Sequence, residues 1–133
     1  MCPATTAWKR MTMVVMEITM AAMVGVQAVQ ERRSRLGDMS ELNDGEVETI
    51  FTSPPYWNKR KYSEEEGLGN EKTSEEFVLN LSEHLRDCKR VLNDRGSFFL
   101  NLGDTFYNGN LQNVPHRVIL KLQEQGWILR NTI

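Results

Sequence analysis

A hydroxyl group, two prolines and two aromatic rings follow one another directly in Ser53-Pro54-Pro55-Tyr56-Trp57. Each proline lacks an N–H and fixes its φ at about −65°, so the pair ends a strand and forms a rigid turn. In such a turn the Ser53 hydroxyl and the Pro54 carbonyl are acceptors for which no neighbouring N–H competes. They can bind the edge of a flat, amine-bearing substrate while a ring covers its face. The pattern predicts a site for an aromatic amine, and the alternative is a strand-ending turn with a packed Tyr56.

An aromatic amine is a weak nucleophile because its lone pair is delocalised into the ring. Two acceptors that bind both amine hydrogens favour a pyramidal nitrogen and return electron density to it. The proton can leave after the nitrogen has attacked, so no strong base is needed beforehand. We therefore expect at Ser53 and Pro54 a group transfer to nitrogen that depends on positioning and electrostatics.

Strand and helix patterns alternate around this turn. The apolar run at residues 47–51 predicts a strand at 47–52 that ends at the turn. Thr73 and Glu76 have the spacing of a capping box and predict the start of a helix. Residues 93–96 predict its end. Its apolar residues recur at three- and four-residue spacing and predict one buried face: Phe77, Val78, Leu81, Leu85, Cys88 and Leu92.

A second strand and helix follow, and then a third strand. Residues 97–102 are apolar and rich in aromatic residues, which favours a strand. Asn113 can cap a helix with a proline in its first turn, and Gly126 ends that helix. Residues 127–133 predict the third strand.

Strands separated by helices of these lengths imply right-handed parallel crossovers. The predicted fold is a three-layer α/β sheet, whose ligands lie beyond the carboxyl ends of the strands. Ser53 and Asp104 both fall at such ends. The topology therefore supports one shared site for these two residues.

Residues 53–56 resemble the catalytic motif of the DNA amino-methyltransferases, which transfer a methyl group from S-adenosylmethionine to an exocyclic base amine. Their motif has Asp, Asn or Ser, then Pro-Pro, then an aromatic residue. The Ser form, with Thr before it and Trp after it, resembles the cytosine-N4 branch; Ser does not exclude adenine-N6. The resemblance covers residues 36–133 in family order, through a Gly-Asp turn at 37–40, a strand and loop at 96–106, and a helix and strand at 114–131.

The resemblance implies a role for each motif residue. Ser53 and the carbonyl of Pro54 would bind the base amine, with Pro55 completing the turn, and Tyr56 would stack on the base. The amine of a base inside a duplex cannot be reached, so the nucleotide must be flipped out. The predicted enzyme is a site-specific DNA methyltransferase of a restriction–modification system, cytoplasmic, in a prokaryotic, viral or plasmid-borne context.

Three further residues are expected at the base pocket. Trp57 would line it or, equally, cover the edge of the sheet. Gly103 and Asp104 resemble the loop that borders the pocket. Asp104 would contact the substrate or orient Ser53, and the competing interpretation is a plain turn.

Charged residues near the motif are candidates for DNA and cofactor contacts. Lys59, Arg60 and Lys61 would contact phosphates, or belong to a solvated loop beside the glutamates at 64–66. Asp38 resembles the acidic turn that meets the cofactor's adenine, or is a helix N-cap. The net charge of −2 gives no global sign of nucleic-acid binding, so any DNA contact must be local.

The remaining titratable residues predict no further chemistry. Two cysteines, Cys2 and Cys88, are too few for a disulfide framework and favour a reducing compartment. His84 and His116 are expected to be structural, because no metal-ligand spacing occurs.

Residues 1–34 read as a Met-rich leader outside the family, and residues 35–133 as part of a methyltransferase domain. For the leader a short amphipathic or poorly ordered segment is favoured over the alternative, a signal peptide or membrane span. A glycine-rich Phe-x-Gly-x-Gly cofactor loop does not occur in these 133 residues. We therefore expect a partial Rossmann-like S-adenosylmethionine-dependent methyltransferase fold, with a mainly parallel sheet that lacks several strands. Strand edges would stay unpaired, because the strand that the family places between the second and third strands is also missing. Such a fragment is expected to be inactive alone and to need a complementing chain with the glycine-rich loop. The alternative is a non-catalytic DNA-binding or interaction remnant.

Overall fold

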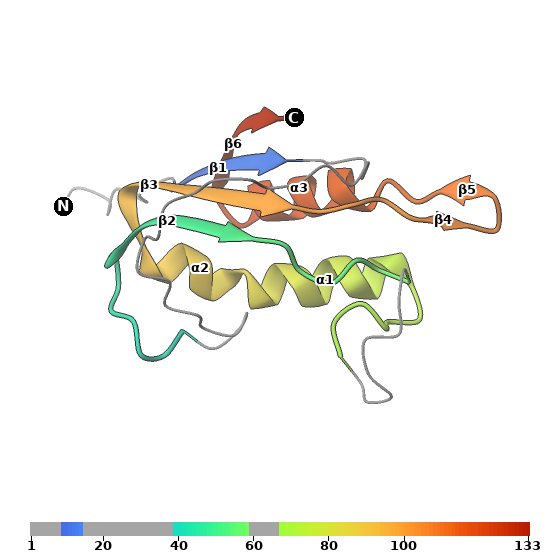
Figure 1. Cartoon of the computed structure of the whole chain (residues 1–133), viewed down its shortest axis with the longest axis horizontal. Coiled ribbons are helices and arrows are strands. Elements are labelled where there is room, and N and C mark those ends of the chain that lie inside the picture. Colours follow the sequence, from blue (N-terminus) through green and yellow to red (C-terminus); the bar gives the residue numbers. More distant parts are fainter. Residues whose placement is uncertain (1–8, 15–38, 59–66) are drawn as a thin grey trace, which may run out of the picture.

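The computed structural model describes residues 9–14, 39–58 and 67–133. Figure 1 shows a sheet with helices beside it and a small hairpin that projects from one end. The elements in chain order are β1 (Lys9–Val14), β2 (Val47–Thr52), α1 (Ser74–His84), α2 (Arg86–Val91), β3 (Leu92–Asn101), β4 (Phe106–Tyr107), β5 (Asn110–Leu111), α3 (Val114–Glu124) and β6 (Trp127–Thr132).

The main sheet has four parallel strands in the order β2-β3-β1-β6. The predicted strands at 47–52, 97–102 and 127–133 are confirmed, as is the helix before the third strand. The single helix predicted after the motif is instead two helices, α1 and α2, which meet at Leu85, and Leu92 belongs to β3. β3 begins earlier than expected, at Leu92. Its pairing with β2 jumps from Val47↔Leu92 to Thr49↔Ser97, so the predicted helix-ending turn at 93–96 is a bulge within the strand.

β1 corrects one expectation about the edges of the sheet. We expected no strand between β3 and β6, yet β1 pairs with both, through Arg10↔Ser97 and Lys9↔Trp127. The backbone of β1 thereby satisfies hydrogen-bonding groups that would otherwise stay open on two strands. The division into a leader at 1–34 and a domain at 35–133 stays a prediction, but a strand from the first segment lies inside the sheet.

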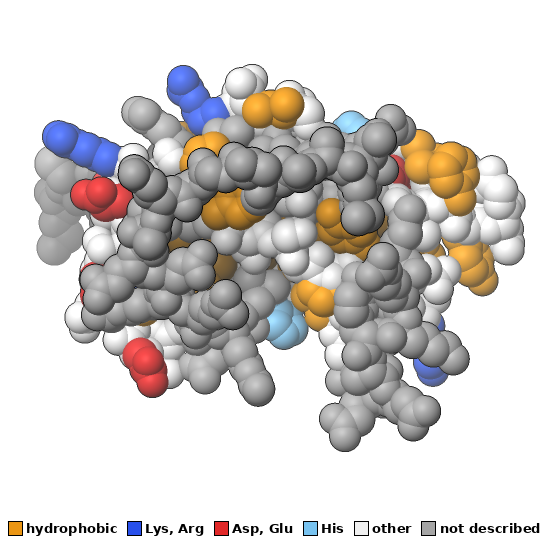
Figure 2. Space-filling view, in the orientation of Figure 1, with side chains coloured by type: hydrophobic (Ala, Val, Ile, Leu, Met, Phe, Trp, Pro, Cys, Tyr) orange, Lys and Arg blue, Asp and Glu red, His pale blue; other side chains and the backbone are white. Residues whose placement is uncertain are grey.

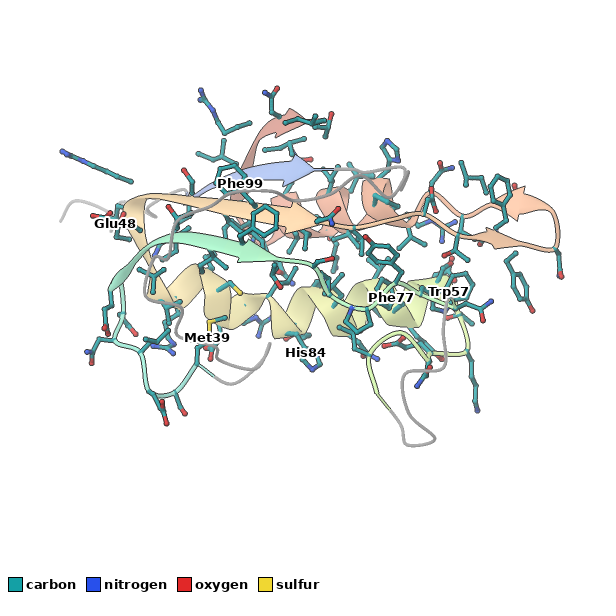
Figure 3. All side chains as sticks on the ribbon, viewed as in Figure 1. Met39, Glu48, Trp57, Phe77, His84 and Phe99 are labelled. Atoms are coloured by element: carbon teal, nitrogen blue, oxygen red, sulfur yellow. The ribbon has the colours of Figure 1, made fainter. Side chains whose placement is uncertain are left out.

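The helices of the described residues lie on one face of the sheet. α1 and α3 contact each other, and one apolar cluster joins both helices to alternate residues of β3, including Phe98 and Leu100. The intervening Phe99 is half-buried and stacks on the exposed Phe51, with ring centroids 6.2 Å apart. Figure 3 shows Phe77 at α1 and Phe99 on the sheet. The described residues thus form two layers rather than the expected three, because both crossovers step across the sheet in the same direction.

The start of α1 follows the predicted capping box. The Thr73 hydroxyl accepts a hydrogen bond from the Glu76 N–H at 3.1 Å. The Glu76 carboxylate accepts from the N–H of Lys72 at 3.2 Å. Together these bonds satisfy N–H groups at the helix start and fix where α1 leaves the loop that follows the motif.

Candidate functional site

The motif lies at the carboxyl end of β2, where the chain leaves the sheet. Ser53 is exposed, Pro54 is buried, and Pro55 and Tyr56 are half-buried. The buried proline holds the turn against the protein while the serine hydroxyl stays open to solvent. This is the arrangement that a substrate-binding turn requires.

Asn101 lies beside Ser53. β2 and β3 run in register to Thr52↔Leu100, so the next residue of each strand meets its neighbour. The Asn101 amide Nδ2 donates to Ser53 Oγ at 3.4 Å. The sequence analysis missed this contact; the available signal was a polar residue that ends an apolar strand next to the motif strand.

Tyr56 lies against Gly103 in the loop after β3. A Cβ added to Gly103 would lie 2.8 Å from Tyr56 Cε2 and 3.0 Å from Cδ2. The ring therefore occupies the space that any side chain at position 103 would need. Two of the predicted site residues are thus in direct contact.

Trp57 is anchored within the protein. Its side chain is 3% exposed, and its indole N–H donates to the Glu71 carbonyl at 3.0 Å. Its own carbonyl accepts from the Thr105 hydroxyl at 2.7 Å. The Tyr107 ring packs beside it at a centroid distance of 5.8 Å, and Figure 3 shows Trp57 next to the start of α1. These contacts tie the end of the motif to the loop after β3.

The Asp104 carboxylate lies at the start of α3. Its Oδ1 accepts from the Thr105 N–H at 2.8 Å and from the Val114 N–H at 3.0 Å. Asn113, which we expected to cap this helix, occupies the N-cap position with φ 53° and makes no side-chain cap. Asp104 therefore supplies the cap from ten residues earlier in the chain, and the described contacts link it to the helix rather than to Ser53.

A family comparison decides what this turn belongs to. Residues 47–133, which run from β2 to the end of the chain, match the family model described as DNA methylase. The chain belongs to the DNA methylase family. The predicted resemblance is therefore confirmed, on a segment that includes the motif and the whole loop after β3.

Curated relatives of this DNA methylase chain are Type II methyltransferases. M.SfiI of Streptomyces fimbriatus is 36% identical over 110 residues, which cover 70% of this chain and 26% of the relative. M.MwoI of Methanothermobacter wolfeii is 36% identical over 96 residues, covering 69% and 14%. M.Cfr9I of Citrobacter freundii is 32% identical over 127 residues, covering 74% and 42%. The chain thus spans less than half the length of each of these relatives, and no solved structure matches it significantly.

Several predicted residues fall outside the part of the chain that the structure describes. These are the candidate cofactor residue Asp38 and the candidate phosphate contacts Lys59, Arg60 and Lys61. Their roles stay predictions.

Cys88 and His84 of the methylase chain both lie among the described residues. Cys88 is buried, and burial raises the pKa of its thiol to about 12, so it is no nucleophile near neutral pH. His84 Nδ1 lies 2.7 Å from the Asn80 carbonyl. Within 9–14, 39–58 and 67–133, no group of three or more His, Cys, Asp or Glu residues could hold a metal ion. No helix in these ranges is long and apolar enough to cross a membrane.

Proposed function

We propose that this chain is the base-binding part of a cytosine-N4 DNA methyltransferase that uses S-adenosylmethionine. The observation that carries the proposal is the exposed Ser53 hydroxyl at the carboxyl end of β2, three residues before Tyr56, in a member of the DNA methylase family. Ligands of parallel sheets bind at this end of the strands. The Type II methyltransferase relatives suggest that the enzyme belongs to a restriction–modification system, acting in the cytoplasm.

Ser53 and Pro54 would bind the amine of the target base. The Ser53 Oγ accepts one amine hydrogen and the Pro54 carbonyl accepts the other, which favours a pyramidal, more nucleophilic nitrogen. Because the Pro54 ring is buried, the turn that carries both acceptors is held in place before the base arrives and needs little reorganisation during the reaction. The amine proton leaves to solvent after attack.

Tyr56 would hold the flipped base by its face. Stacking of a base on an aromatic side chain contributes about 1–3 kcal/mol. That contribution offsets part of the cost of unstacking the nucleotide from the duplex. Trp57 and Gly103 would support this ring from behind, since Trp57 is buried and Gly103 lies in contact with the ring.

The cofactor would be held largely by parts of the enzyme beyond the described residues. S-adenosylmethionine supplies the methyl group when bound. Asp38 is our candidate for its adenine, and a glycine-rich loop is the candidate for the rest; the described residues supply base-binding groups. β2 pairs only with β3 in the described sheet, so its other edge can accept a further strand. We propose that this strand comes with the glycine-rich loop, from the same polypeptide or from a complementing chain.

Double-stranded DNA is the proposed substrate, and its phosphates would meet Lys59, Arg60 and Lys61 directly after the motif. A local cluster is needed because the net charge of the chain is −2. Replacing all three by Gln should weaken DNA binding and flatten its salt dependence. If the variant and the unsubstituted chain bound DNA with the same affinity at each salt concentration, the three residues would not belong to the DNA interface.

The decisive experiment is methyl transfer from labelled S-adenosylmethionine to DNA, with the chain supplied together with a segment that carries the glycine-rich loop. We expect label in N4-methylcytosine. Label only in N6-methyladenine would replace the cytosine assignment by its adenine alternative. DNA binding without any transfer would instead support the non-catalytic alternative.

A further inference from the structure

The end of β3 contacts the motif at two points that lie two residues apart. Asn101 contacts Ser53 through its amide, and Gly103 contacts Tyr56 through its backbone surface. The proposed function uses Ser53 and Tyr56 but assigns no task to Asn101. We propose that residues 101–103 position the motif: Asn101 directs the Ser53 hydroxyl, and Gly103 sets the plane of the Tyr56 ring. The proposal rests on the proposed function, in which these two groups meet the base.

The Ser53 hydroxyl needs a directing group because it is both a donor and an acceptor. Its O–H rotates freely unless a partner fixes it. An O–H turned towards the substrate amine would bind the lone pair that has to attack. A neighbouring amide oxygen that accepts the hydroxyl hydrogen would turn the O–H away and leave the Oγ lone pairs for the amine hydrogens. Ser53 is exposed, and Asn101 is the described residue whose side chain bonds to it.

The amide oxygen of Asn101 is the atom that could accept the Ser53 hydroxyl hydrogen. Asn101 Oδ1 is buried and has no hydrogen-bond partner among the described residues. A buried acceptor without a partner destabilises a protein, so a structural role alone gives a poor account of an asparagine here. Rotation of the amide by 180° would let Oδ1 accept the Ser53 hydroxyl hydrogen, since Nδ2 and Oδ1 exchange places.

Gly103 has no Cβ, and this leaves room for the Tyr56 ring. A Cβ would approach two ring carbons to 2.8 and 3.0 Å, which real side chains do not tolerate, so the ring would have to move. The φ of Gly103 lies outside the left-handed region. An alanine would therefore fit the backbone at this position, and its effect would come through the ring.

Methyl transfer by the complemented enzyme tests both contacts. We expect Asn101→Leu to lower kcat about 10-fold with little change in KM for DNA, the size expected for one lost hydrogen bond. Asn93→Leu, on the same strand but away from the motif, should leave kcat unchanged. An Asn101→Leu enzyme with wild-type kcat would overturn the role of Asn101.

The Gly103 contact predicts a non-additive pair. Gly103→Ala should lower kcat/KM in the wild type but cost nothing further in a Tyr56→Ala background, because the displaced ring is then absent. Gly96→Ala is the matched control. Its Cβ would meet Leu92 Cγ and Cδ1 at 2.6 Å on the same strand, so it should lower stability and leave kcat unchanged. Full additivity of Gly103→Ala and Tyr56→Ala would overturn the role of Gly103.

A thiol probe tests Asn101 without any methyl transfer. In the 133-residue chain, Ser53→Cys combined with Cys2→Ser leaves one reactive thiol, because Cys88 is buried with its pKa raised to about 12. The pH dependence of its alkylation reports the thiol pKa. Adding Asn101→Leu should raise that pKa through loss of the amide donor, and Asn101→Asp should raise it further through a like charge. An unchanged thiol pKa in the Asn101→Leu and Asn101→Asp variants would overturn the role of Asn101. The expected pKa shifts, in a chain that transfers no methyl group even when complemented, would overturn the proposed function alone.

Discussion

Ser53 is the residue on which the proposed chemistry depends most directly. Ser53→Ala removes the exposed acceptor and leaves the buried Pro54 and the turn in place. We expect kcat of the complemented enzyme to fall roughly 100-fold, the scale found when one preorganised polar group is removed from a reacting centre. Thr49→Ala is the matched control, since it removes an exposed hydroxyl from the same strand. Steady-state kinetics checks both, and a wild-type rate in Ser53→Ala would exclude this mechanism.

Tyr56 separates stacking from hydrogen bonding. Tyr56→Phe keeps the ring against Gly103 and removes only the hydroxyl, whereas Tyr56→Ala removes the ring. We expect Phe to keep most of the kcat/KM for DNA and Ala to lose about 10-fold or more, in line with one base stack. Equal losses in the two variants would assign the effect to the hydroxyl instead.

Asn101 shows what a local sequence pattern cannot give. The motif was recognisable because its residues are adjacent, and prolines and aromatics have strong local meaning. The contact between Asn101 and Ser53 joins residues 48 positions apart. It exists because two parallel strands end side by side, so it needs the register of the sheet.

Asp104 belongs to the scale of the element, because its carboxylate caps α3. Asp104→Ala leaves the Thr105 and Val114 N–H groups without this acceptor. It should lower the free energy of unfolding by about 1 kcal/mol, as for other helix caps, while Asp104→Asn keeps an oxygen acceptor and loses less. Urea unfolding measures the difference. If Asp104 also contacted the substrate through its charge, the Asp104→Asn variant would keep most of its stability and lose methyl-transfer activity.

The sequence predicted α3 itself but not the residue that caps it. The helix itself was predicted from its apolar spacing and its closing Gly126, which has φ 85°. The cap was assigned to Asn113 because that residue stands at the right place in the chain. Residue order could not show that the loop after β3 folds back and brings Asp104 to the helix start.

Arg90 ties α2 to the segment before β2. Its guanidinium donates to the Met39 and Leu42 carbonyls at 2.9 Å each, to Asp44 Oδ1 at 2.8 Å and to Asp87 Oδ1 at 3.1 Å. The hydrogen bond from Arg90 holds the pKa of the Asp87 carboxyl below its ordinary value of 3.8. A lowered carboxyl pKa stabilises the fold above the ordinary value, and this stabilisation is lost as the pH falls through the lowered one.

Arg90 therefore predicts part of the acid sensitivity of the chain. Arg90→Gln should lower the free energy of unfolding at pH 7 and narrow the stability difference between pH 7 and pH 3, because Asp87 then titrates closer to its unfolded value. Unfolding curves at the two pH values measure this. Arg86→Gln removes an exposed pair with Glu83 and is the control; an equal effect of the two substitutions would deny Arg90 a special role.

At the scale of the whole molecule, β1 carries the clearest prediction. Removing residues 1–14 deletes the strand that lies between β3 and β6. We expect a lower denaturant midpoint and a tendency to aggregate, since two parallel edges become open. Removing only residues 1–8 is the control and should leave the midpoint close to that of the full chain. A shortened chain from residue 15 with an unchanged midpoint would show that β1 adds nothing to stability.

The whole molecule also shows the limit of local reading. Lys9–Val14 carries no helix or strand signal stronger than its Met-rich surroundings, and its partners lie near the other end of the chain. The two-layer arrangement of the described residues differs from the predicted three layers, because it depends on the strand order β2-β3-β1-β6, which puts both crossovers on the same face. Hydrophobic side chains also gather at the β4–β5 hairpin, where Phe106, Tyr107 and Leu111 are exposed (Figure 2).

The place of β1 has a consequence for the newborn chain. β1 is made before β2, yet both of its neighbours in the sheet, β3 and β6, are made after β2. β2 and β3 can pair and bury the face of α1 before β6 has been made, when β1 still lacks one of its two partners. Sheets closed by such distant partners fold slowly. These strands are therefore most exposed to proteases and to other chains in the interval before β6 pairs with β1, and that is when a chaperone would help them most.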